Sequence, residues 1–430
     1  MALPDEPVRE IRPLGRPPRA RVALPGSKSL TNRALVTAAL AEGRTTLVNA
    51  LFSDDTLAMV DALRRLGVAV AVDTAAQTIH VDGCGGALPA RGATLDAGGA
   101  GTVARFLTAV VALGVGRFVV DGNARMRQRP VQDLVDALGA LGVRAAATRG
   151  CPPVVVDAAG LAGGRAVVRG ATSSQFLSGL LLAAPYARAD VELVVDGPLV
   201  GAPYVEMTIA VMAAFGVQVE REGLHRFRVR AGQRYRARLY AIEPDASSAA
   251  YFFAAAALTG GRVEVPGLSA ASLQGDVRFV DLLEAMGCRA TRAADALAVE
   301  GPPLLHAVDV DLAAMSDQTM TLAALAPFAD GPTRIRGVAH IRHQESDRLA
   351  ATAAELRRLG QEVDEFADGL RVTPRPVRPA TVVTYDDHRI AMAFALVGLR
   401  VPGVRIAGWP CVRKTFPDFF ERLELLRISA

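Results

Sequence analysis

The sequence predicts an α/β protein built from six copies of one supersecondary unit. Two observations predict this class. Amphipathic segments that end on glycine recur at a nearly constant spacing, and each such glycine is followed by two short stretches in which apolar and polar residues alternate. A unit of about 72 residues, repeated six times, fills all 430 residues of the chain.

The glycines mark the predicted ends of the second helix of each unit. They are Gly67, Gly142, Gly216, Gly287 and Gly360. Successive members lie 75, 74, 71 and 73 residues apart. Glycine is favoured directly after a helix because it adopts the left-handed conformation there without steric cost. One further step along the chain, residues 421–427 predict a sixth such helix that lacks its glycine.

The stretches after each glycine predict a strand, a turn and a second strand, most clearly at 216–223 and 227–230. Upstream of each glycine, a first helix rich in small residues opens on a polar or glycine-containing segment, where Ser, Thr and Asp are favoured caps. These openings are residues 27–29, 101–102, 172–175, 245–248, 316–319 and 386–389. A strand and a loop follow, so the unit is helix–strand–loop–helix–strand–strand.

A non-enzymatic solenoid scaffold is one alternative for such a repeat. Two features oppose it. Solenoid units are usually about 20–50 residues long. The polar residues also concentrate at two places in each unit, the N-terminus of the first helix and the loop before the second. Because helix N-termini attract anions, six of them suit a polyanionic ligand.

The composition excludes several classes. Aromatic residues make up only 5% of the chain, which argues against base-stacking platforms, and the net charge of +4 is small and spread out. Four cysteines lie far apart without metal-ligand spacing, so structural zinc and a disulfide framework are not expected. The first 21 residues lack the apolar core of a signal peptide, and the apolar runs are too short to span a bilayer. We therefore expect a cytoplasmic protein without nucleic-acid or membrane partners.

Lysine is the rarest basic residue and draws attention to two positions. Only Lys28 and Lys414 occur among 48 basic residues. Lysine is a compact charge that can release a proton, whereas arginine stays charged. Lys28 lies in the turn-like segment 24–33, and Lys414 lies near the end of the chain. The segment around Lys28 is not a phosphate loop, because Ser27 separates Gly26 from Lys28 and the upstream glycine is missing. The glycines at 98, 99 and 101 do not have the dinucleotide-binding spacing.

Each candidate also has an ordinary explanation. Serines and aspartates at helix openings are common caps. Residues 125–129 form a charge run of a kind that usually faces solvent, and Glu345 and Arg348 are spaced for an i, i+3 pair on a helix surface. The set becomes specific only when its members are taken together and in order.

Taken in order, the motifs resemble those of the enolpyruvyl transferases. They occupy residues 24–33, 98–105, 125–130, 172–176, 245–248, 345–348, 386–389 and 414–417. From about residue 20 onward the chain is similar to the 5-enolpyruvylshikimate-3-phosphate synthases of that family. The resemblance implies six βαβαββ-type repeats in two domains of three repeats, an inverse α/β prism with the active site in the interdomain cleft. One domain would comprise residues 21–242, and the other residues 1–20 plus 243–430.

The resemblance also implies an activity. Members of the family transfer the enolpyruvyl group of phosphoenolpyruvate to the 5-hydroxyl of shikimate-3-phosphate, by addition and elimination through a tetrahedral intermediate, with release of phosphate. This reaction belongs to the shikimate pathway of aromatic amino-acid biosynthesis and is the target of glyphosate. The implied enzyme is a cytoplasmic monomer with small-molecule substrates and no cofactor or metal. An enolpyruvyl transferase with another hydroxyl acceptor, such as a nucleotide, stays open.

The matching motif positions imply three sets of site residues. The catalytic set is Lys28, Asp317 and Glu345. The phosphoenolpyruvate set is Lys28, Gly101, Thr102, Arg125, Gln175, Arg348, Arg389 and Lys414. The shikimate-3-phosphate set is Lys28, Ser29, Arg33, Ser173, Ser174, Gln175, Tyr204, Asp317 and Gln344. Asp317 is the expected base and Glu345 the expected acid, and Lys28 can serve either step.

The chain departs from the family pattern at four positions. Gly201 stands where the family usually has a serine, and Gly99 replaces a common asparagine. His340 and Gln344 stand where many members have asparagine and lysine. Three of these four positions lie toward the acceptor, so the acceptor is the part of the implied reaction that most needs a test.

Overall fold

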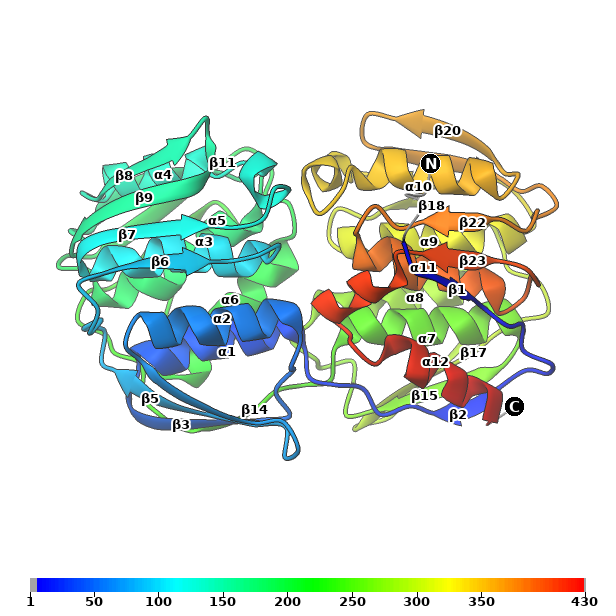
Figure 1. Cartoon of the computed structure of the whole chain (residues 1–430), viewed down its shortest axis with the longest axis horizontal. Coiled ribbons are helices and arrows are strands. Elements are labelled where there is room, and N and C mark those ends of the chain that lie inside the picture. The colour runs from blue at the N-terminus through cyan, green and yellow to red at the C-terminus, as the bar shows by residue number, and fades with distance from the viewer. Residues whose placement is uncertain (1–5, 429–430) are drawn as a thin grey trace. The chain divides into compact units, whose positions relative to one another are not determined.

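The computed structural model describes residues 6–428 and divides the chain into two compact units. One unit is Gly26–Glu243, and the other joins the residues up to Pro25 to those from Pro244 onward. Positions 1–5 and 429–430 of the expected domain 1–20 plus 243–430 lie outside the described residues. The described part of each unit contains three small sheets and the helices that pack against them (Figure 1).

The unit Gly26–Glu243 contains repeats one to three. Repeat one comprises α1 (Lys28–Leu40), β3 (Glu42–Val48), α2 (Asp54–Arg65), β4 (Ala69–Asp73) and β5 (Thr78–Cys84). Repeat two comprises β6 (Gly92–Asp96), α3 (Gly101–Val110), β7 (Val115–Asp121), α4 (Gln132–Ala140), β8 (Arg144–Thr148) and β9 (Cys151–Ala159). Repeat three comprises β10 (Gly164–Arg169), α5 (Ser174–Ala183), β11 (Val191–Asp196), α6 (Ala202–Ala214), β12 (Glu220–Glu222) and β13 (Arg226–Val229).

The other unit contains repeats four to six. Repeat four comprises α7 (Ala246–Thr259), β15 (Arg262–Pro266), α8 (Phe279–Ala285), β16 (Arg289–Arg292) and β17 (Ala296–Glu300). Repeat five comprises β18 (Asp309–Asp311), α9 (Thr319–Leu325), β19 (Thr333–Arg336), α10 (Arg348–Arg358), β20 (Glu362–Phe366) and β21 (Gly369–Thr373). Repeat six comprises β22 (Thr381–Val383), α11 (His388–Gly398), β23 (Arg405–Ala407) and α12 (Phe419–Ile428).

The predicted helix ends are confirmed. All five glycines have φ between +83° and +94°, in the left-handed region. The residue after each glycine donates its N–H to a carbonyl five positions back, as Val68 does to Leu63 at 3.1 Å and Gln361 to Leu356 at 3.0 Å. This is the Schellman pattern, which satisfies carbonyls at the helix end.

The four-stranded sheets share one order, seen in repeat two. There β6 pairs in parallel with β7, β7 pairs antiparallel with β9, and β9 pairs antiparallel with β8. Alternate residues of β9, such as Val154 and Val156, are fully buried. One face of the sheet therefore packs on the helices, as the alternating pattern of the sequence predicted.

Three strands come from distant parts of the chain. β14 (Leu239–Ala241) follows repeat three, yet it pairs in parallel with β3 of repeat one. β2 (Arg19–Arg21) pairs in parallel with β15 of repeat four. β1 (Val8–Glu10) pairs antiparallel with β23 and completes the three-stranded sheet of repeat six.

The first helices of the repeats form the cores of both units. Every residue of α3 and of α11 is buried, and so are all residues of α1 except Lys28 and Ser29 at its start. These helices therefore lie inside their units rather than on the surface. In residues 6–428, no helix is long and apolar enough to cross a membrane, and no group of three or more His, Cys, Asp and Glu is arranged to hold a metal ion.

Candidate functional site

The predicted site residues lie in two groups, one in each unit. In the unit Gly26–Glu243 they lie at the openings of α1, α3 and α5, at the start of α6 and, for Arg125, directly before the turn η2 (Met126–Gln128). In the other unit they gather on short turns before α9 and α10, at the opening of α11, and on the turn η8 (Trp409–Lys414). The two groups are described separately.

Lys28 is the first residue of α1, after the N-cap Ser27. Its Nζ lies 3.4 Å from Oδ2 of Asp55, and the two side chains are 15% and 4% exposed. Asp55 lies in the first turn of α2, the second helix of the same repeat. The two polar places of repeat one therefore meet, and they hold an ammonium group next to a buried carboxylate.

Arg33 lies one and a half turns further along α1 and is fully buried. Its Nε donates to Thr208 Oγ1 at 2.7 Å, and its two Nη groups donate to the carbonyls of Ser29 at 3.0 Å and Tyr204 at 2.9 Å. The guanidinium also lies 5.2 Å from the ring centre of Phe106. Burial lowers the pKa of Arg33 to about 10. Arg33 thus joins α1, α3 and α6.

Gly101 opens α3 at a point where three polar side chains converge. A Cβ atom on this residue would lie 2.8 Å from Arg129 Nη2, 2.9 Å from Gln175 Oε1 and 3.2 Å from Arg105 Nη1. Both arginines are more than nine-tenths buried. Two guanidinium groups at a helix opening form a positively charged surface suited to an anion. Thr102, the next residue, accepts a hydrogen bond from Asn32 Nδ2 at 2.8 Å.

Arg105 and Arg129 are absent from the predicted set. Both lie inside motif segments that the sequence singled out, 98–105 and 125–130. Arg125, which was predicted, is half-buried and donates to Gln128 at 3.4 Å. Spacing alone does not say which arginine of a charge run turns inward, so burial was the missing signal.

The opening of α5 holds the predicted serines. Ser173 is the N-cap and accepts the Gln175 N–H at 3.3 Å, while Ser174 is buried. Gly201, at the start of α6, has φ of +61°, and a Cβ there would lie 3.0 Å from Ser174 Oγ. In the part of the chain that the structure describes, no donor meets the buried Gln175 Oε1. A ligand that offers a hydroxyl donor would fit this position.

In the other unit, the buried guanidinium of Arg348 is the centre of the group. It pairs with Asp317 at 2.9 Å, with Glu345 at 2.9 Å and with Asp387 at 2.8 Å, and its side chain is 1% exposed. The three carboxylates raise the pKa of Arg348 above its ordinary value although burial opposes them. The i, i+3 pair with Glu345 is therefore present, but it lies inside the unit and not on a helix surface.

Two of these carboxylates are shared with other cations. Asp317, on the turn η5 (Ser316–Gln318), lies 2.6 Å from Arg389 Nη2. Glu345 lies 4.0 Å from Lys414 Nζ. Asp317 and Glu345 are 18% and 13% exposed, so both remain accessible at the edge of the cluster.

The third carboxylate, Asp387, is completely buried and has a structural role. Its Oδ1 accepts the N–H of Arg389 at 3.0 Å, as the N-cap of α11, and its Oδ2 accepts from Ser346 at 3.0 Å. Sequence reasoning named it as part of a helix opening but did not find its contact with Arg348, which spans 39 positions.

Gln344 and His340, the two residues of this unit that differ from the family pattern, contact residues of the Arg348 group or next to it. Gln344 accepts a hydrogen bond from Arg348 through its Oε1. His340, on the turn η7 (Ala339–His343), has its Nε2 2.9 Å from Ser316 Oγ. Burial lowers the pKa of His340, and the nearby Asp317 opposes that shift.

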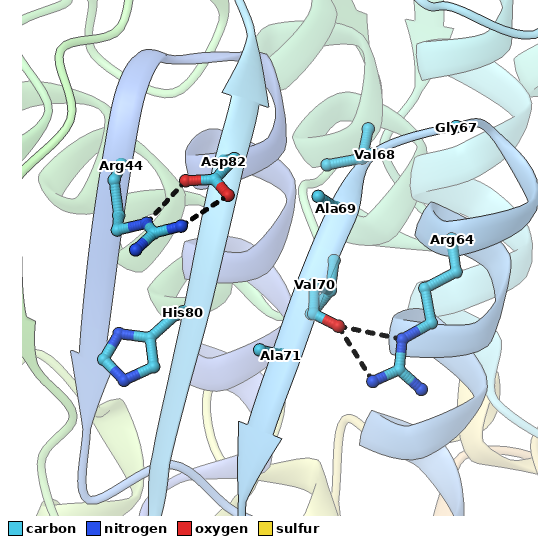
Figure 2. Close-up of a pocket in the computed structure, with 9 residues that line it drawn as sticks. All are labelled: Arg44, Arg64, Gly67, Val68, Ala69, Val70, Ala71, His80 and Asp82. Carbon is cyan, nitrogen blue, oxygen red and sulfur yellow. Dashed lines mark hydrogen bonds and ion pairs between the residues drawn. The ribbon is translucent and has the colours of Figure 1, made fainter.

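A separate pocket of about 510 Å³ lies over the sheet of repeat one (Figure 2). Its cations are already engaged. Arg44 pairs with Asp82 at 2.6 Å, and Arg64 donates twice to the Val70 carbonyl, at 2.8 and 3.0 Å (Figure 2). The residues that line this pocket include none of those predicted for the site.

Comparison with known proteins agrees with these motifs. The family profile of EPSP synthase (3-phosphoshikimate 1-carboxyvinyltransferase) matches residues 15–423. A 3-phosphoshikimate 1-carboxyvinyltransferase of Trichormus variabilis is 49% identical over 96% of this chain and 97% of its own. A chloroplastic one of Arabidopsis thaliana is 46% identical over 97% of this chain and 83% of its own. The solved EPSP synthase of Acinetobacter baumannii superposes with a TM-score of 0.82 and 26% identity, over 97% of this chain and 98% of its own.

Proposed function

The chain belongs to the EPSP synthase family of transferases, and we propose that it transfers the enolpyruvyl group of phosphoenolpyruvate to the 5-hydroxyl of shikimate-3-phosphate. Phosphate is the second product. The names of the relatives and the chemistry of both groups of residues support this assignment.

The observation that supports it most is that Asp317 and Glu345 share the buried guanidinium of Arg348. A shared cation fixes two carboxylates at a set separation and keeps both accessible. The reaction needs one base and one acid at neighbouring atoms of the two substrates. Asp317 and Glu345 supply two such groups without a further cofactor.

The addition step forms one C–O bond and moves two protons. Asp317 takes the proton of the 5-hydroxyl as its oxygen attacks C2 of phosphoenolpyruvate. Glu345 or Lys28 gives a proton to C3, which becomes a methyl group. In the elimination step a proton leaves that methyl group, the C2–O bond to phosphate breaks, and the enol ether is released. Each transfer of this kind typically contributes about 10²–10⁴ in rate.

The cations hold the charges that move during the reaction. The opening of α3 at Gly101 and Thr102 offers backbone N–H groups, beside the guanidinium of Arg129. Arg125, Arg348, Arg389 and Lys414 complete the proposed phosphoenolpyruvate set. Cations placed where negative charge develops stabilise the transition state as well as the bound anion.

In the unit Gly26–Glu243, the proposed acceptor set lies on α1, α5 and α6 and at their openings. Ser173, Ser174 and Gln175 offer hydroxyl and amide groups to shikimate-3-phosphate, and the donor-free Oε1 of Gln175 suits one of its hydroxyls. The remaining members of this proposed set are Lys28, Ser29, Arg33, Tyr204, Asp317 and Gln344. Arg33 supports the set through structure, since its guanidinium already binds Ser29 and Tyr204.

We also infer a monomer that works on small molecules alone. In two of the described sheets, an arginine donates to a carbonyl of one edge strand. Arg64 donates to the Val70 carbonyl on β4, and Arg357 donates to the Val363 carbonyl on β20 at 2.8 Å. Blocked edge carbonyls disfavour pairing with a second chain.

A direct assay tests the proposed function. Phosphate release is measured with phosphoenolpyruvate alone, with shikimate-3-phosphate alone and with both, and the organic product is identified by mass spectrometry. Release that requires both substrates, with a product larger by one enolpyruvyl group, is the expected result. Release only with another hydroxyl acceptor would assign a different transferase, and no release with any acceptor would reject enzymatic transfer.

A further inference from the structure

Repeat four contributes a buried carboxylate that none of the proposed catalytic steps uses. Asp276 lies on the turn η4 (Gly275–Arg278), between β15 and α8, and is 5% exposed. This turn precedes the second helix of its repeat, as Glu345 does in repeat five, and Asp55 lies in the first turn of the corresponding helix of repeat one. By its position in the repeat, Asp276 corresponds to residues of the candidate site.

The carboxylate joins repeat four to repeat five through one oxygen. Its Oδ2 accepts from the hydroxyl of Ser247, on the first turn of α7, and from Gln318 Nε2 at 3.0 Å. Gln318 is fully buried, and its Oε1 accepts from Thr321 at 3.1 Å. Because both ends of the Gln318 amide are engaged, the turn η5 is held in place. The residue directly before Gln318 is Asp317.

The charges around Asp276 come from two elements. Asp317, on η5, and Arg389, on α11, both interact with it electrostatically. Burial raises the pKa of Asp276 to about 6, Asp317 adds to the rise, and Arg389 and the hydrogen bonds oppose it. Interaction between two charges is mutual, so an ionised Asp276 also favours the protonated form of Asp317.

Asp317 needs such a neighbour if it is to accept a proton. Arg348 and Arg389 both bind its carboxylate, at 2.9 and 2.6 Å. Two guanidinium groups favour the ionised form and make a carboxylate a weak base. A second negative charge in the same desolvated region acts in the opposite sense.

We propose that Asp276 is a positioning residue for Asp317: through Gln318 it fixes the turn that presents Asp317, and its negative charge keeps Asp317 basic against two arginines. This inference rests on the proposed function, in which Asp317 accepts the proton of the acceptor hydroxyl. It assigns repeat four a part in proton transfer without contact with either substrate.

The test compares Asp276→Asn with Asp276→Ala in the full-length protein. Asparagine removes the charge, and its Oδ1 can still accept both hydrogen bonds. We expect Asp276→Asn to lower kcat about threefold to tenfold at pH 8 and to move the acid limb of the kcat–pH profile to lower pH. The KM values for both substrates should stay within about twofold. Asp276→Ala should lose more kcat because the η5 turn is also released.

Asp281→Asn is the matched control. Asp281 lies on α8 of the same repeat and is 62% exposed, where it pairs with Arg292. Its replacement should leave the pH profile unchanged. If Asp276→Asn does not fold, Gln318→Met tests whether the hydrogen bond through Gln318 positions Asp317. The expected result is a loss of kcat and no change in KM.

The outcomes separate this inference from the proposed function. An Asp276→Asn enzyme with the kcat and pH profile of the wild type would overturn it, even if Asp276→Ala were unstable. Activity in the wild type that disappears in Asp317→Asn, together with an unaltered Asp276→Asn profile, would reject the role of Asp276 alone. A wild type without enolpyruvyl transfer would reject the proposed function itself.

Discussion

Arg348 and Asp387 form an ion pair that is shut off from solvent, with Nε 2.8 Å from Oδ2 and side chains 1% and 0% exposed. Asp387 also caps α11 and accepts from Ser346. The pair therefore connects the guanidinium that organises the candidate site to the start of the most buried helix of repeat six.

Removal of Asp387 is expected to destabilise the protein strongly. Asp387→Ala leaves part of a buried guanidinium without its partner and removes a helix cap, which costs about 3–5 kcal/mol. Asp387→Asn should cost less, since its amide oxygen still accepts hydrogen bonds. Urea unfolding measures both. Asp347→Ala is the control, because Asp347 caps α10 but is 43% exposed, and should cost about 1 kcal/mol. Equal costs for Asp387→Ala and Asp347→Ala would contradict the importance of the buried pair.

Lys28 should not tolerate replacement by arginine. Lys28→Arg keeps the positive charge beside Asp55 but cannot give up a proton, so we expect kcat to fall at least about 100-fold. Lys414→Arg is the comparison, because its proposed role needs only charge, and it should retain much more activity. Initial rates of phosphate release measure both. Near-normal turnover in Lys28→Arg would remove Lys28 from proton transfer.

A methyl group on Gly101 should weaken the binding of phosphoenolpyruvate. Its carbon would lie 2.8 Å from Arg129 Nη2 and 2.9 Å from Gln175 Oε1, so the polar groups around the helix opening must shift. We expect the KM for phosphoenolpyruvate to rise roughly tenfold in Gly101→Ala. Gly139→Ala in α4 is the control, because nothing lies within 4 Å of its added carbon. That variant should keep normal kinetics and gain about 0.5–1 kcal/mol of stability.

The raised pKa of Asp276 predicts a pH-dependent stability that does not depend on catalysis. A carboxyl whose pKa rises from 3.8 to about 6 on folding stabilises the protein when it is protonated. That contribution is complete below about pH 4 and is lost as the pH rises through 6. Relative to wild type, Asp276→Asn should therefore gain about 2 kcal/mol more at pH 7.5 than at pH 4.5. Urea unfolding at the two pH values measures this, and a constant difference would contradict it.

The edge arginines predict a change in association. Arg64→Ala combined with Arg357→Ala exposes the carbonyls of Val70 and Val363 on two edge strands. We expect dimers or larger species at high concentration, detected by light scattering after size-exclusion chromatography. Arg65→Ala is the control, since Arg65 pairs with Asp61 on the surface of α2. A strictly monomeric double variant would show that other features protect these edges.

Repetition made much of the fold predictable. The helix-ending glycine recurs five times and the polar helix opening six times, so signals that are weak at one position support one another. Strands β1, β2 and β14 were not predicted, because each is three residues long and pairs with a partner far along the chain. Nothing in a segment such as Val8–Glu10 indicates that Arg405–Ala407 will receive it.

The candidate site was predictable in its residue types and less so in its contacts. Motif positions named Arg348 and Glu345, and the structure brings them together. They did not indicate that Arg33 turns toward Thr208, 175 positions away, or that Asp276 belongs to the cluster. Partners of buried polar groups depend on three-dimensional packing, which a single sequence records only where a motif is local.

The pairing of strands that lie far apart in the sequence sets the order in which the two units can complete their sheets during synthesis. The unit Gly26–Glu243 has all of its strands once residue 243 has left the ribosome. β1 is made before its partner strand β23, which follows about 400 residues later. At typical rates of translation this interval is roughly 20–80 s. The N-terminal segment must therefore remain unpaired, and open to chaperones or proteases, while an entire unit folds after it.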